Sequence, residues 1–423
     1  MRVSAKAVAL AVLLAGGSAR ATDYWVSAVF GNNATGDGSL ANPWATIAHA
    51  LAQGPVFGDV VHVYCGLYDA SHGETFPISI PAGVTLKGEE GAHVTILDAG
   101  GADDVVDLAS DVTLTGFTIR NSSNGWWDAG VADWSPGSNL VIDGCIFRDN
   151  QRGLHLWTGH SNVLVRNCVF VNNANDAFSC FGSTGVTVLN CSFRGNLKGM
   201  IFDGSTATVR NTVVTNSGVA GIQNSINVPS TITLDHNCVF ANAINYDPPT
   251  LLPGPGSISA DPKWANALQG DLHVWPTSPC IDAGIGDPLL AAVDLDGDPR
   301  VEGGAVDIGA DERPWPDLIL ANLPLIGASA LFDVFGNPSS PWGLFAAPLP
   351  SAGGIPTPWG TLHLDPSTLS HLVSGGTNAE GGSLLSFSVP PAPSLVGQTV
   401  YLQTIGVGTS GLALSRLRLA PVH

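Results

Sequence analysis

The sequence is poor in charged residues, and above all in basic ones. Of its 423 residues 12% are charged, and 16 Lys and Arg stand against 35 Asp and Glu, which gives a formal net charge of −19. A chain without a basic excess releases no counterions from a phosphate backbone, so binding of DNA or RNA through phosphate contacts is excluded. The same balance excludes adsorption to an anionic membrane surface.

Long apolar runs are also missing. Residues 7–16 (AVALAVLLAG) form a short apolar run, well below the roughly 20 residues that span a bilayer. The run follows Arg2 and Lys6 and precedes the small-x-small triplet that ends at Ala21. This order is typical of a secretory signal peptide. We therefore expect residues 1–21 to be removed near Ala21, and the mature protein to be secreted, in the extracellular space or at the cell surface.

Cysteine is scarce too, since 7 in 423 residues do not make a disulfide framework. Their spacing is more informative, because similar phrases (DGCIF, RNCVF, LNCSF, HNCVF) recur with an Asn at the turns. The repeated positions are a Cys column (Cys145, Cys168, Cys191, Thr212, Cys238), a Phe column (Phe147, Phe170, Phe193, Phe240) and two Asn columns (Asn167, Asn190, Asn211, Asn237; Asn150, Asn173, Asn196, Asn216, Asn242). An internal repeat of roughly 20–26 residues indicates a solenoid.

Each repeat holds two short β-rich runs around an Asn or Gly turn and has no helical pattern. This is typical of one coil of a parallel β-helix, in which equivalent positions stack at about 4.8 Å. We expect the Phe and Cys columns to stack inside the coils, with Cys acting as a small core residue rather than as a metal ligand or a bridge. The Asn amides should bond to turn backbone and to the next coil.

Two sets of short motifs resemble a known family. They are residues 24–27 (YWVS), 36–39 (GDGS), 42–44 (NPW), 58–61 (GDVV) and 73–77 (GETFP) near the start, and 278–284 (SPCIDAG), 294–297 (DLDG) and 306–309 (VDIG) near the end. Residues 23–312 thereby resemble secreted bacterial right-handed parallel β-helix proteins of the pectin-lyase-like superfamily. The resemblance implies the fold. It leaves activity open, because these helices serve as lyases, hydrolases, epimerases and adhesins alike.

The chain is therefore predicted to be all-β, with a right-handed parallel β-helix over residues 22–312. Residues 43–53 have helical spacing and should cap its N-terminal end, because an exposed strand edge invites aggregation. Residues 313–316 read as a linker. The rest, residues 317–423, should form a small β-sandwich-like domain that resembles an accessory C-terminal module of secreted bacterial proteins, with strands at 361–364, 384–389, 399–405 and 412–419.

Candidate functional residues lie on the second strand of each coil and on the turn before it. Alternation predicts two outward columns, with the loop and turn residues beside them. The first column is Ala132, His155, Phe178, Ile201 and Gln223; the second is Trp134, Trp157, Cys180 and Asp203; the loop carries Trp126, Trp127 and Asp128; the turns align Arg152, Asn175 and Lys198, with Asp176 alongside.

Such an outward strip has the chemistry of a polysaccharide groove. Flat indoles contact the apolar faces of sugars, and polar groups bind their hydroxyls. We take Trp126, Trp127, Trp134 and Trp157, with Phe178, as candidate substrate-binding residues. The alternative is that two of the Trp only fill an insertion against the solenoid, but outward Trp is costly without a partner.

Two kinds of cleavage fit these residues. A lyase would use Lys198 or Arg152 toward the sugar carboxylate, with Asp176 or Asp203 holding Ca²⁺. A hydrolase would use two carboxyls, Asp176 with Asp203 or with Asp133, although Asp133 could point inward. The candidate catalytic residues are thus Asp176, Lys198, Asp203, His155 and Arg152. No complete lyase or hydrolase signature is present, and each of these residues alone also fits a turn or surface role.

The function expected from the sequence is binding and cleavage of an extracellular polysaccharide by a monomeric protein. The alternative is a non-catalytic carbohydrate-binding, adhesion or cell-surface protein, in which the strip is a docking surface only. Because polyanion and protein would repel, a neutral glycan or a Ca²⁺-bridged acidic one is preferred. Residues 294–298 (DLDGD) alternate oxygens like a calcium loop but lack its twelfth-position Glu, which favours a turn.

Overall fold

The structure is a computed structural model. It describes residues 22–266, 271–313, 317–320, 329–335, 337, 339–357, 360–379, 381–392, 394, 398–408, 411–415 and 418–421. The predicted signal peptide and most of the predicted linker, residues 314–316, lie outside the described residues. No helix in the described part of the chain is long and apolar enough to span a membrane.

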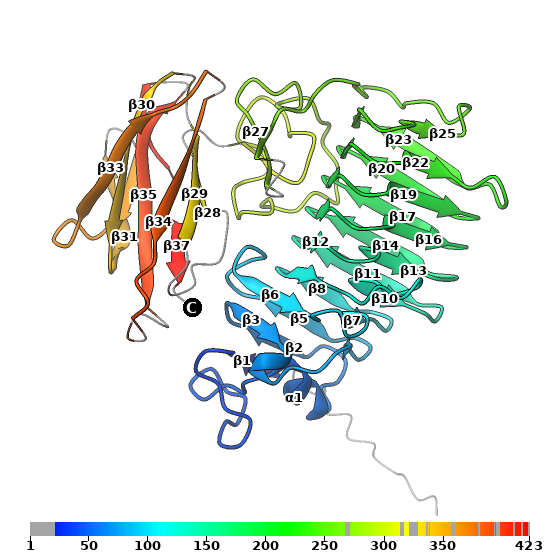
Figure 1. The fold of residues 1–423 in the computed structure, drawn as a ribbon, viewed down its shortest axis with the longest axis horizontal. Helices are drawn as coiled ribbons and strands as arrows, with labels where there is room; N and C mark the ends of the chain where they lie inside the picture. The colour runs from blue at the N-terminus through cyan, green and yellow to red at the C-terminus, as the bar shows by residue number, and fades with distance from the viewer. Residues whose placement is uncertain are drawn as a thin grey trace, which may run out of the picture.

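Residues 23–247 form a parallel β-solenoid with three sheets along its length (Figure 1). Sheet 1 contains β1 (Asp23–Val26), β2 (Val60–Val63), β5 (Thr85–Gly88), β8 (Thr113–Thr115), β11 (Ser138–Asp143), β14 (Ser161–Arg166), β17 (Thr184–Leu189), β20 (Thr206–Arg210) and β23 (Thr231–Asp235). Sheet 2 contains β3 (Gly66–Asp69), β6 (Thr95–Asp98), β9 (Thr118–Arg120), β12 (Ile146–Arg148), β15 (Val169–Val171), β18 (Ser192–Arg194), β21 (Val213–Thr215) and β24 (Cys238–Phe240). Sheet 3 contains β4 (Ile78–Ser79), β7 (Val106–Asp107), β10 (Val131–Asp133), β13 (Leu154–Leu156), β16 (Asp176–Phe181), β19 (Lys198–Asp203), β22 (Ala220–Asn224) and β25 (Tyr246–Asp247).

The core is built from ladders of identical side chains. Phe147, Phe170 and Phe193 are fully buried, and their rings stack in succession at centroid distances of 4.5 and 4.4 Å with planes 3° apart. The three evenly spaced cysteines of the Cys column are buried in the same core, and all seven cysteines of the chain are free thiols. The inward Phe ladder predicted from the sequence is therefore confirmed.

The last members of these ladders were misplaced by one residue. Cys238 pairs with Val213 rather than with Thr212, and Phe240 pairs with Thr215 and is only half-buried. The sequence similarity of HNCVF and RNTVV aligns Cys238 with Thr212, 26 positions earlier. The strand pairing aligns it with Val213, 25 positions earlier.

Asparagine side chains connect successive coils at the turn between sheets 2 and 3. The Asn173 amide donates to the carbonyl of Phe147 (3.2 Å) and to Oδ1 of Asn196 (2.9 Å), while its Oδ1 accepts from the backbone N–H of Asn150 (3.2 Å). The Asn196 amide repeats the pattern toward Phe170 (3.0 Å). Buried turn backbone is thus satisfied by the next coil, as the Asn periodicity predicted.

The N-terminal end is covered by α1 (Ile47–Ala52), which buries Ile47, Ala50 and Leu51 against the first coils. Thr46 is its N-cap, and the Glu74 carboxylate accepts from the free N–H groups of Ile47 (2.7 Å) and Ala48 (2.9 Å). A short 3₁₀ turn, η1 (Ala70–His72), follows β3. The predicted capping helix is present, but shorter than residues 43–53.

The segment after β25 runs back along the corner between sheets 1 and 2. Ile258 still pairs with Cys238, and β26 (Trp264–Asn266) and β27 (Asp271–Val274) form an antiparallel pair. Beyond them the amide of Asn211 donates to the carbonyl of Ile285 (2.8 Å), and that of Asn190 donates to the carbonyl of Asp307 (2.9 Å). This closing segment therefore covers the side of several coils, not only the end of the last one.

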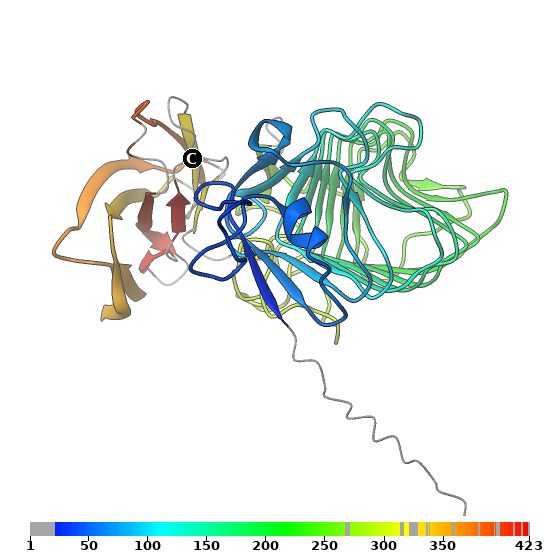
Figure 2. The ribbon, with the colours of Figure 1, turned by 90° about the horizontal axis from the view of Figure 1, so that it is seen from below.

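The C-terminal residues form antiparallel sheets beside the solenoid, in line with the predicted small β domain (Figures 1 and 2). Their strands are β28 (Asp317–Leu320), β29 (Ser329–Phe335), β30 (Pro341–Ala347), β31 (Pro350–Thr357), β32 (Gly360–Leu364), β33 (Ser370–Gly376), β34 (Gly382–Ser388), β35 (Thr399–Gly408), β36 (Gly411–Leu414) and β37 (Arg418–Pro421). The strand predicted at residues 412–419 is thus two strands, β36 and β37.

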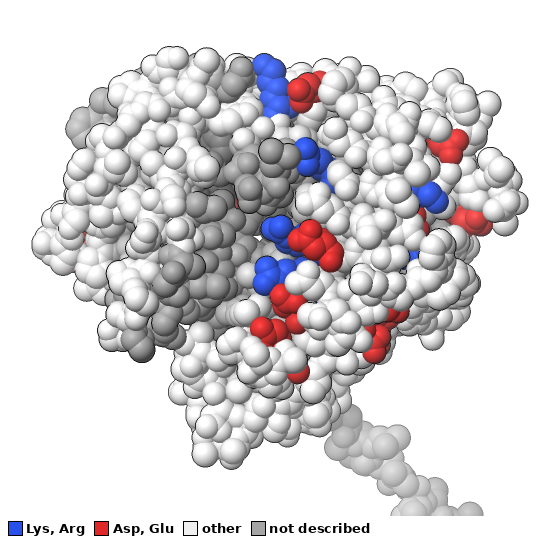
Figure 3. Space-filling model, in the orientation of Figure 1, with Lys and Arg blue, Asp and Glu red and all other residues white. Residues whose placement is uncertain are grey.

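An apolar cluster joins these sheets to the outer side of sheet 2. Val94, just before β6, and Ile96, within it, pack in one cluster with Leu318, Phe332 and Val334 of the C-terminal sheets. On the face seen in Figure 3 the few Lys, Arg, Asp and Glu side chains lie mostly in the middle and at the right, and large areas carry no charge. In the described part of the chain, the C-terminal sheets therefore pack against sheet 2 and do not cover the outer face of sheet 3.

Candidate functional site

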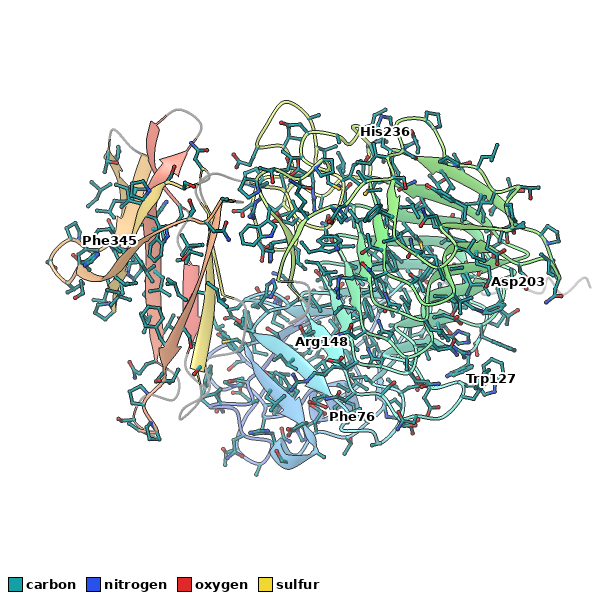
Figure 4. All side chains as sticks on the ribbon, turned by 45° about the horizontal axis from the view of Figure 1, so that its top comes forward. Phe76, Trp127, Arg148, Asp203, His236 and Phe345 are labelled. Carbon is teal, nitrogen blue, oxygen red and sulfur yellow. The ribbon has the colours of Figure 1, made fainter. Side chains whose placement is uncertain are left out.

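The predicted strip lies on the outer face of sheet 3. Figure 4 places Trp127 and Asp203 together on the side of the solenoid remote from the C-terminal sheets. All four predicted Trp are exposed, from 37% for Trp157 to 67% for Trp126. Large exposed apolar side chains on one face point to a binding surface.

The loop between β9 and β10 carries two of these indoles. It is held at its base by the Asp104 carboxylate, which accepts from the backbone N–H of Ala129 (2.5 Å). Arg152, from the next coil, lies over the loop with its guanidinium carbon 5.0 Å from the Trp127 ring centre and 6.0 Å from that of Trp126. A cation over an indole face is attracted by the ring quadrupole, so Arg152 holds the two rings in place.

Sheet 3 itself supplies the centre of the strip. Trp157 lies edge-on to Trp127 at 4.8 Å, and its centroid is 6.4 Å from that of Trp134 and 5.5 Å from that of Phe181. The Trp134 indole N–H donates to Oδ2 of Asp104 (3.2 Å), which fixes that ring. We call these four rings, Trp127, Trp134, Trp157 and Phe181, the aromatic strip.

His155 lies beneath the aromatic strip and has no exposed surface. Its ring centre is between 5.4 and 6.2 Å from those of all four strip residues, and Nδ1 lies 2.7 Å from the Ser179 hydroxyl. Burial, with smaller contributions from Arg152 and His160, lowers the pKa of His155 to about 3. A neutral, enclosed imidazole supports the strip and does not reach a ligand on it.

Three charged side chains form a row along one edge of the strip. Asp176 pairs in the sheet with Lys198, whose Nζ lies 3.8 Å from Oδ1, and Arg152 approaches Oδ2 with its Nε at 3.5 Å. Arg152 and Asp176 are buried, while Lys198 is half-buried. Burial raises the pKa of Asp176, and the two neighbouring cations oppose that rise. Two cations beside this carboxylate also oppose binding of Ca²⁺ there.

The columns predicted from the sequence need two corrections. His155 pairs with Ser179, and Leu156 pairs with Cys180, so Phe178 and Cys180 are inward core residues and Phe178 cannot touch a substrate. The turn residue aligned between Arg152 and Lys198 is Asp176 rather than Asn175. Both shifts have one cause: Ser179 lies nine positions after Phe170, whereas His155 lies eight positions after Phe147.

The second outward column is otherwise as predicted. Trp134 and Trp157 are one coil apart, and Asp203 follows two coils beyond Trp157, where it pairs with Phe181. Asp133 is buried at an inward position, 2.9 Å from Nε2 of His160, so it does not face the strip. The structure therefore keeps Lys198 and Asp203 half-buried at opposite ends of β19, with Asp203 next to Phe181, while His155, Arg152 and Asp176 are enclosed.

Sequence reasoning missed several residues of the site. Ser179 and Phe181 occupy the two outward positions to which the sequence alignment assigned Phe178 and Cys180. Asp104 was not among the candidates. Asp107 pairs with Ala132 and so precedes it in the first outward column. Burial raises the pKa of Asp104 to about 6, against the opposing effect of its hydrogen bonds to Ala129 and Trp134. Extending the columns one coil toward the N-terminus would have found Asp107, and Asp104 with it.

Metal-binding geometry lies elsewhere among the described residues. The two groups of His and carboxylate side chains close enough to share an ion involve His93, His273 and Asp296, and Asp294, Asp296 and Asp311. The Asp294 carboxylate accepts from the N–H groups of Asp296 (2.9 Å), Asp298 (2.8 Å) and Glu312 (2.7 Å), which is the turn role expected for residues 294–298.

Comparison with known proteins supports the fold. Residues 105–247 match a family model described as a right-handed β-helix region. No curated protein matches the chain. Similar solved structures include the A-module of mannuronan C-5 epimerase AlgE6 from Azotobacter vinelandii, with 17% identity, a TM-score of 0.33, and coverage of 47% of this chain and 71% of that one.

Two further solved structures are similar over larger parts of the chain. The GH136 lacto-N-biosidase from Eubacterium ramulus has 10% identity and a TM-score of 0.30, covering 57% of this chain and 67% of that one. Tailspike protein 2 from Escherichia coli O157:H7 bacteriophage CAB120 has 10% identity and a TM-score of 0.31, covering 89% and 65%. The family match spans the coils that carry the aromatic strip, and the chain has the right-handed parallel β-helix fold that its sequence predicted.

Proposed function

We propose that this protein is secreted and binds an extracellular polysaccharide along the aromatic strip. The observation that carries the proposal is the cluster of Trp127, Trp134, Trp157 and Phe181 on the outer face of sheet 3. Indole rings presented to solvent stack on the apolar faces of pyranose rings, and such contacts tolerate a range of sugars.

The direction of the strip suits a chain-like ligand. Trp134, Trp157, Phe181 and Asp203 follow one another along the solenoid axis in adjacent strands of sheet 3. Strands spaced about 4.8 Å apart make this column roughly 14 Å long. A polysaccharide lying along the axis would meet two indoles first and then the carboxylate of Asp203 at the end of β19, whereas Lys198 begins that strand, roughly 16 Å away.

We further propose that the bound glycan is cleaved near Asp203. Asp203 is the predicted catalytic group that remains half-buried in the outward column of the strip, whereas His155 and Asp176 are enclosed by rings and by cations. Asp203 would act as a carboxylate acid or base. Lys198, at the other end of β19, would contact a more distant part of the glycan, such as a sugar carboxylate. A neutral glycan, or an acidic one bridged by Ca²⁺, suits the net charge of −19.

A non-catalytic role is the second candidate, and a specific observation favours it. Three of the five predicted catalytic residues, Arg152, His155 and Asp176, are buried and serve to hold the strip together. A binding or adhesive protein needs exposed indoles but no reachable catalytic group. A surface whose buried polar groups only hold those indoles in place meets this requirement.

One experiment separates the two candidates. The purified protein is incubated with a panel of polysaccharides, and products are read as new reducing ends and as absorbance of unsaturated uronides. If the strip is catalytic, Asp203→Asn should remove turnover while binding is largely kept, because the loss falls on the transition state. Asp111→Asn, a carboxylate next to sheet 1, should leave turnover unchanged and serves as the matched control.

The remaining outcomes have distinct meanings. Binding without turnover in the wild type supports the non-catalytic role and rejects cleavage. Turnover that survives Asp203→Asn rejects Asp203 as the catalytic group. If no polysaccharide of the panel binds, the proposed function is wrong.

A further inference from the structure

A second polar cluster lies far from the aromatic strip, where the closing segment meets the solenoid. His93 follows β5 in the solenoid, His273 lies on β27, and Asp296 lies in the loop of residues 294–298. Nε2 of His93 is 3.0 Å from Oδ1 of Asp296, and Nε2 of His273 is 2.7 Å from Oδ2. Three distant segments thus bring two imidazole nitrogens to one carboxylate.

The cluster is largely shielded from water. The side chains of His273 and Asp296 are about 95% buried, and that of His93 is about three-quarters buried. The imidazole rings lie 6.0 Å apart with planes 28° apart, on either side of the carboxylate. All three ligand atoms lie within 4.8 Å of one another. Two ligands about 2 Å from a tetrahedral Zn²⁺ are roughly 3.3 Å apart, so small side-chain movements place these atoms around one ion.

An open coordination position is also available. His93, Asp294 and Asp296 line a cavity of about 430 Å³ between the solenoid and the closing segment, which Glu89 and Glu90 also border. Asp294 and Asp296 of this loop form a second cluster of carboxylates with Asp311, which lies later in the closing segment. Because both oxygens of Asp294 already accept backbone N–H groups, Asp311 is the carboxylate that could complete a fourth position, with water as the alternative.

We propose that His93, His273 and Asp296 bind a divalent transition-metal ion of the zinc class. Two imidazoles and one carboxylate are a borderline ligand set that suits Zn²⁺ and its first-row neighbours, whereas Ca²⁺ and Mg²⁺ prefer oxygen ligands throughout. The ion would tie the closing segment, through β27 and residues 294–298, to the coil that carries His93. The site is thus a metal clamp, independent of the proposed function.

A simple ion-pair network is the competing explanation, and the chain contains its own example. His236 approaches a single carboxylate, with Nδ1 2.6 Å from Oδ1 of Asp235. His62 has the opposite arrangement to the cluster, one imidazole between the carboxylates of Glu89 and Asp23. An ion gains two nitrogen ligands only where two imidazoles meet at one carboxylate. His236 and His62 each bring a single imidazole, so they serve as matched controls.

The test uses the full-length protein without a histidine tag, stripped with a chelator and then titrated with Zn²⁺ by calorimetry. We expect one high-affinity Zn²⁺ per chain and a rise in melting temperature. His93→Gln and His273→Gln should each weaken that binding by at least tenfold, whereas His236→Gln should not. Millimolar Ca²⁺ or Mg²⁺ should not displace the ion, because both cations prefer oxygen ligands throughout.

A spectroscopic readout guards against a folding artefact. Co²⁺ in place of Zn²⁺ should give visible absorption from a site with nitrogen ligands, and this band should disappear in His273→Gln while the far-UV circular dichroism stays that of the wild type. Absence of high-affinity Zn²⁺ binding by the wild type would overturn the proposal. So would equal binding by the wild type and both folded variants.

Discussion

At the scale of single residues, neighbouring side chains of one strand lie on opposite faces of the sheet and play different roles. In β13, Leu154 and Leu156 point into the core, and His155 between them points outward under the indoles. Alternation along the strand decides the face, and the covering rings decide whether the outward group is reachable. His155 is therefore an outward residue that behaves energetically as a buried one.

The Phe ladder provides a direct test of the core at this scale. Phe170→Ala removes a fully buried ring that stacks on Phe147 and on Phe193. We expect the free energy of unfolding to fall by about 3–5 kcal/mol, as for other buried aromatic residues. Chemical denaturation measures the change. Phe57→Ala, at an exposed ring, should alter stability little, and an equal loss in both variants would contradict the ladder.

The buried imidazole predicts a pH dependence of stability. In the native state His155 stays neutral down to a pKa of about 3, whereas in the unfolded chain it titrates near its ordinary value of 6.5. Between these values the unfolded state binds the extra proton, so stability falls as the pH drops, by up to about 1.4 kcal/mol per pH unit. His155→Phe cannot bind that proton, and its melting temperature should fall less steeply between about pH 6.5 and 4. Parallel slopes for the two proteins would show that His155 is not held neutral.

At the scale of elements, each coil is short and depends on its neighbours. Strands of two to six residues in sheets 2 and 3 are too short to be stable alone, and their buried turns have backbone groups to satisfy. The Asn ladder meets this need by passing hydrogen bonds from coil to coil. The turn that it supports immediately precedes the strands of the aromatic strip.

Asn173 is the central member of that ladder. Asn173→Ala leaves the buried carbonyl of Phe147 and the N–H of Asn150 without their partner. We expect a loss of about 1–3 kcal/mol for each group left unsatisfied. Thermal melts of this variant and of Asn227→Ala, a change on an exposed loop, make the comparison. If both melt at the wild-type temperature, the ladder does not stabilise the turn.

The periodicity of the sequence predicted the coils correctly, but it predicted the alignment of residues between neighbouring strands of sheet 3 with an error of one residue at β16. The repeat of Asn, Cys and Phe fixed which residues face the core, because burial imposes the same side-chain type at each coil. It could not locate the one extra residue in the turn before β16, because turns of different length keep the same strand pattern. Phe178 was consequently placed outward although it is core, and Phe181 was missed.

At the scale of the molecule, the faces of the solenoid are divided between structure and surface. The C-terminal sheets pack on β6 of sheet 2, and the closing segment binds the Asn side chains at the corner between sheets 1 and 2. The outer face of sheet 3 carries the aromatic strip. Contacts between segments so far apart in sequence depend on packing, so no local pattern could predict the cluster of His93, His273 and Asp296.

The central claim is that the aromatic strip binds a polysaccharide, and calorimetric titration of the wild type and of Trp157→Ala with a glycan found in the panel tests it most directly. Trp157 contacts both Trp127 and Phe181, so its loss should weaken binding by about 1–3 kcal/mol, roughly 5- to 150-fold in Kd. Phe57→Ala, an exposed aromatic residue outside the strip, should bind like the wild type. Unchanged affinity in Trp157→Ala, or an equal loss in Phe57→Ala, would contradict the claim.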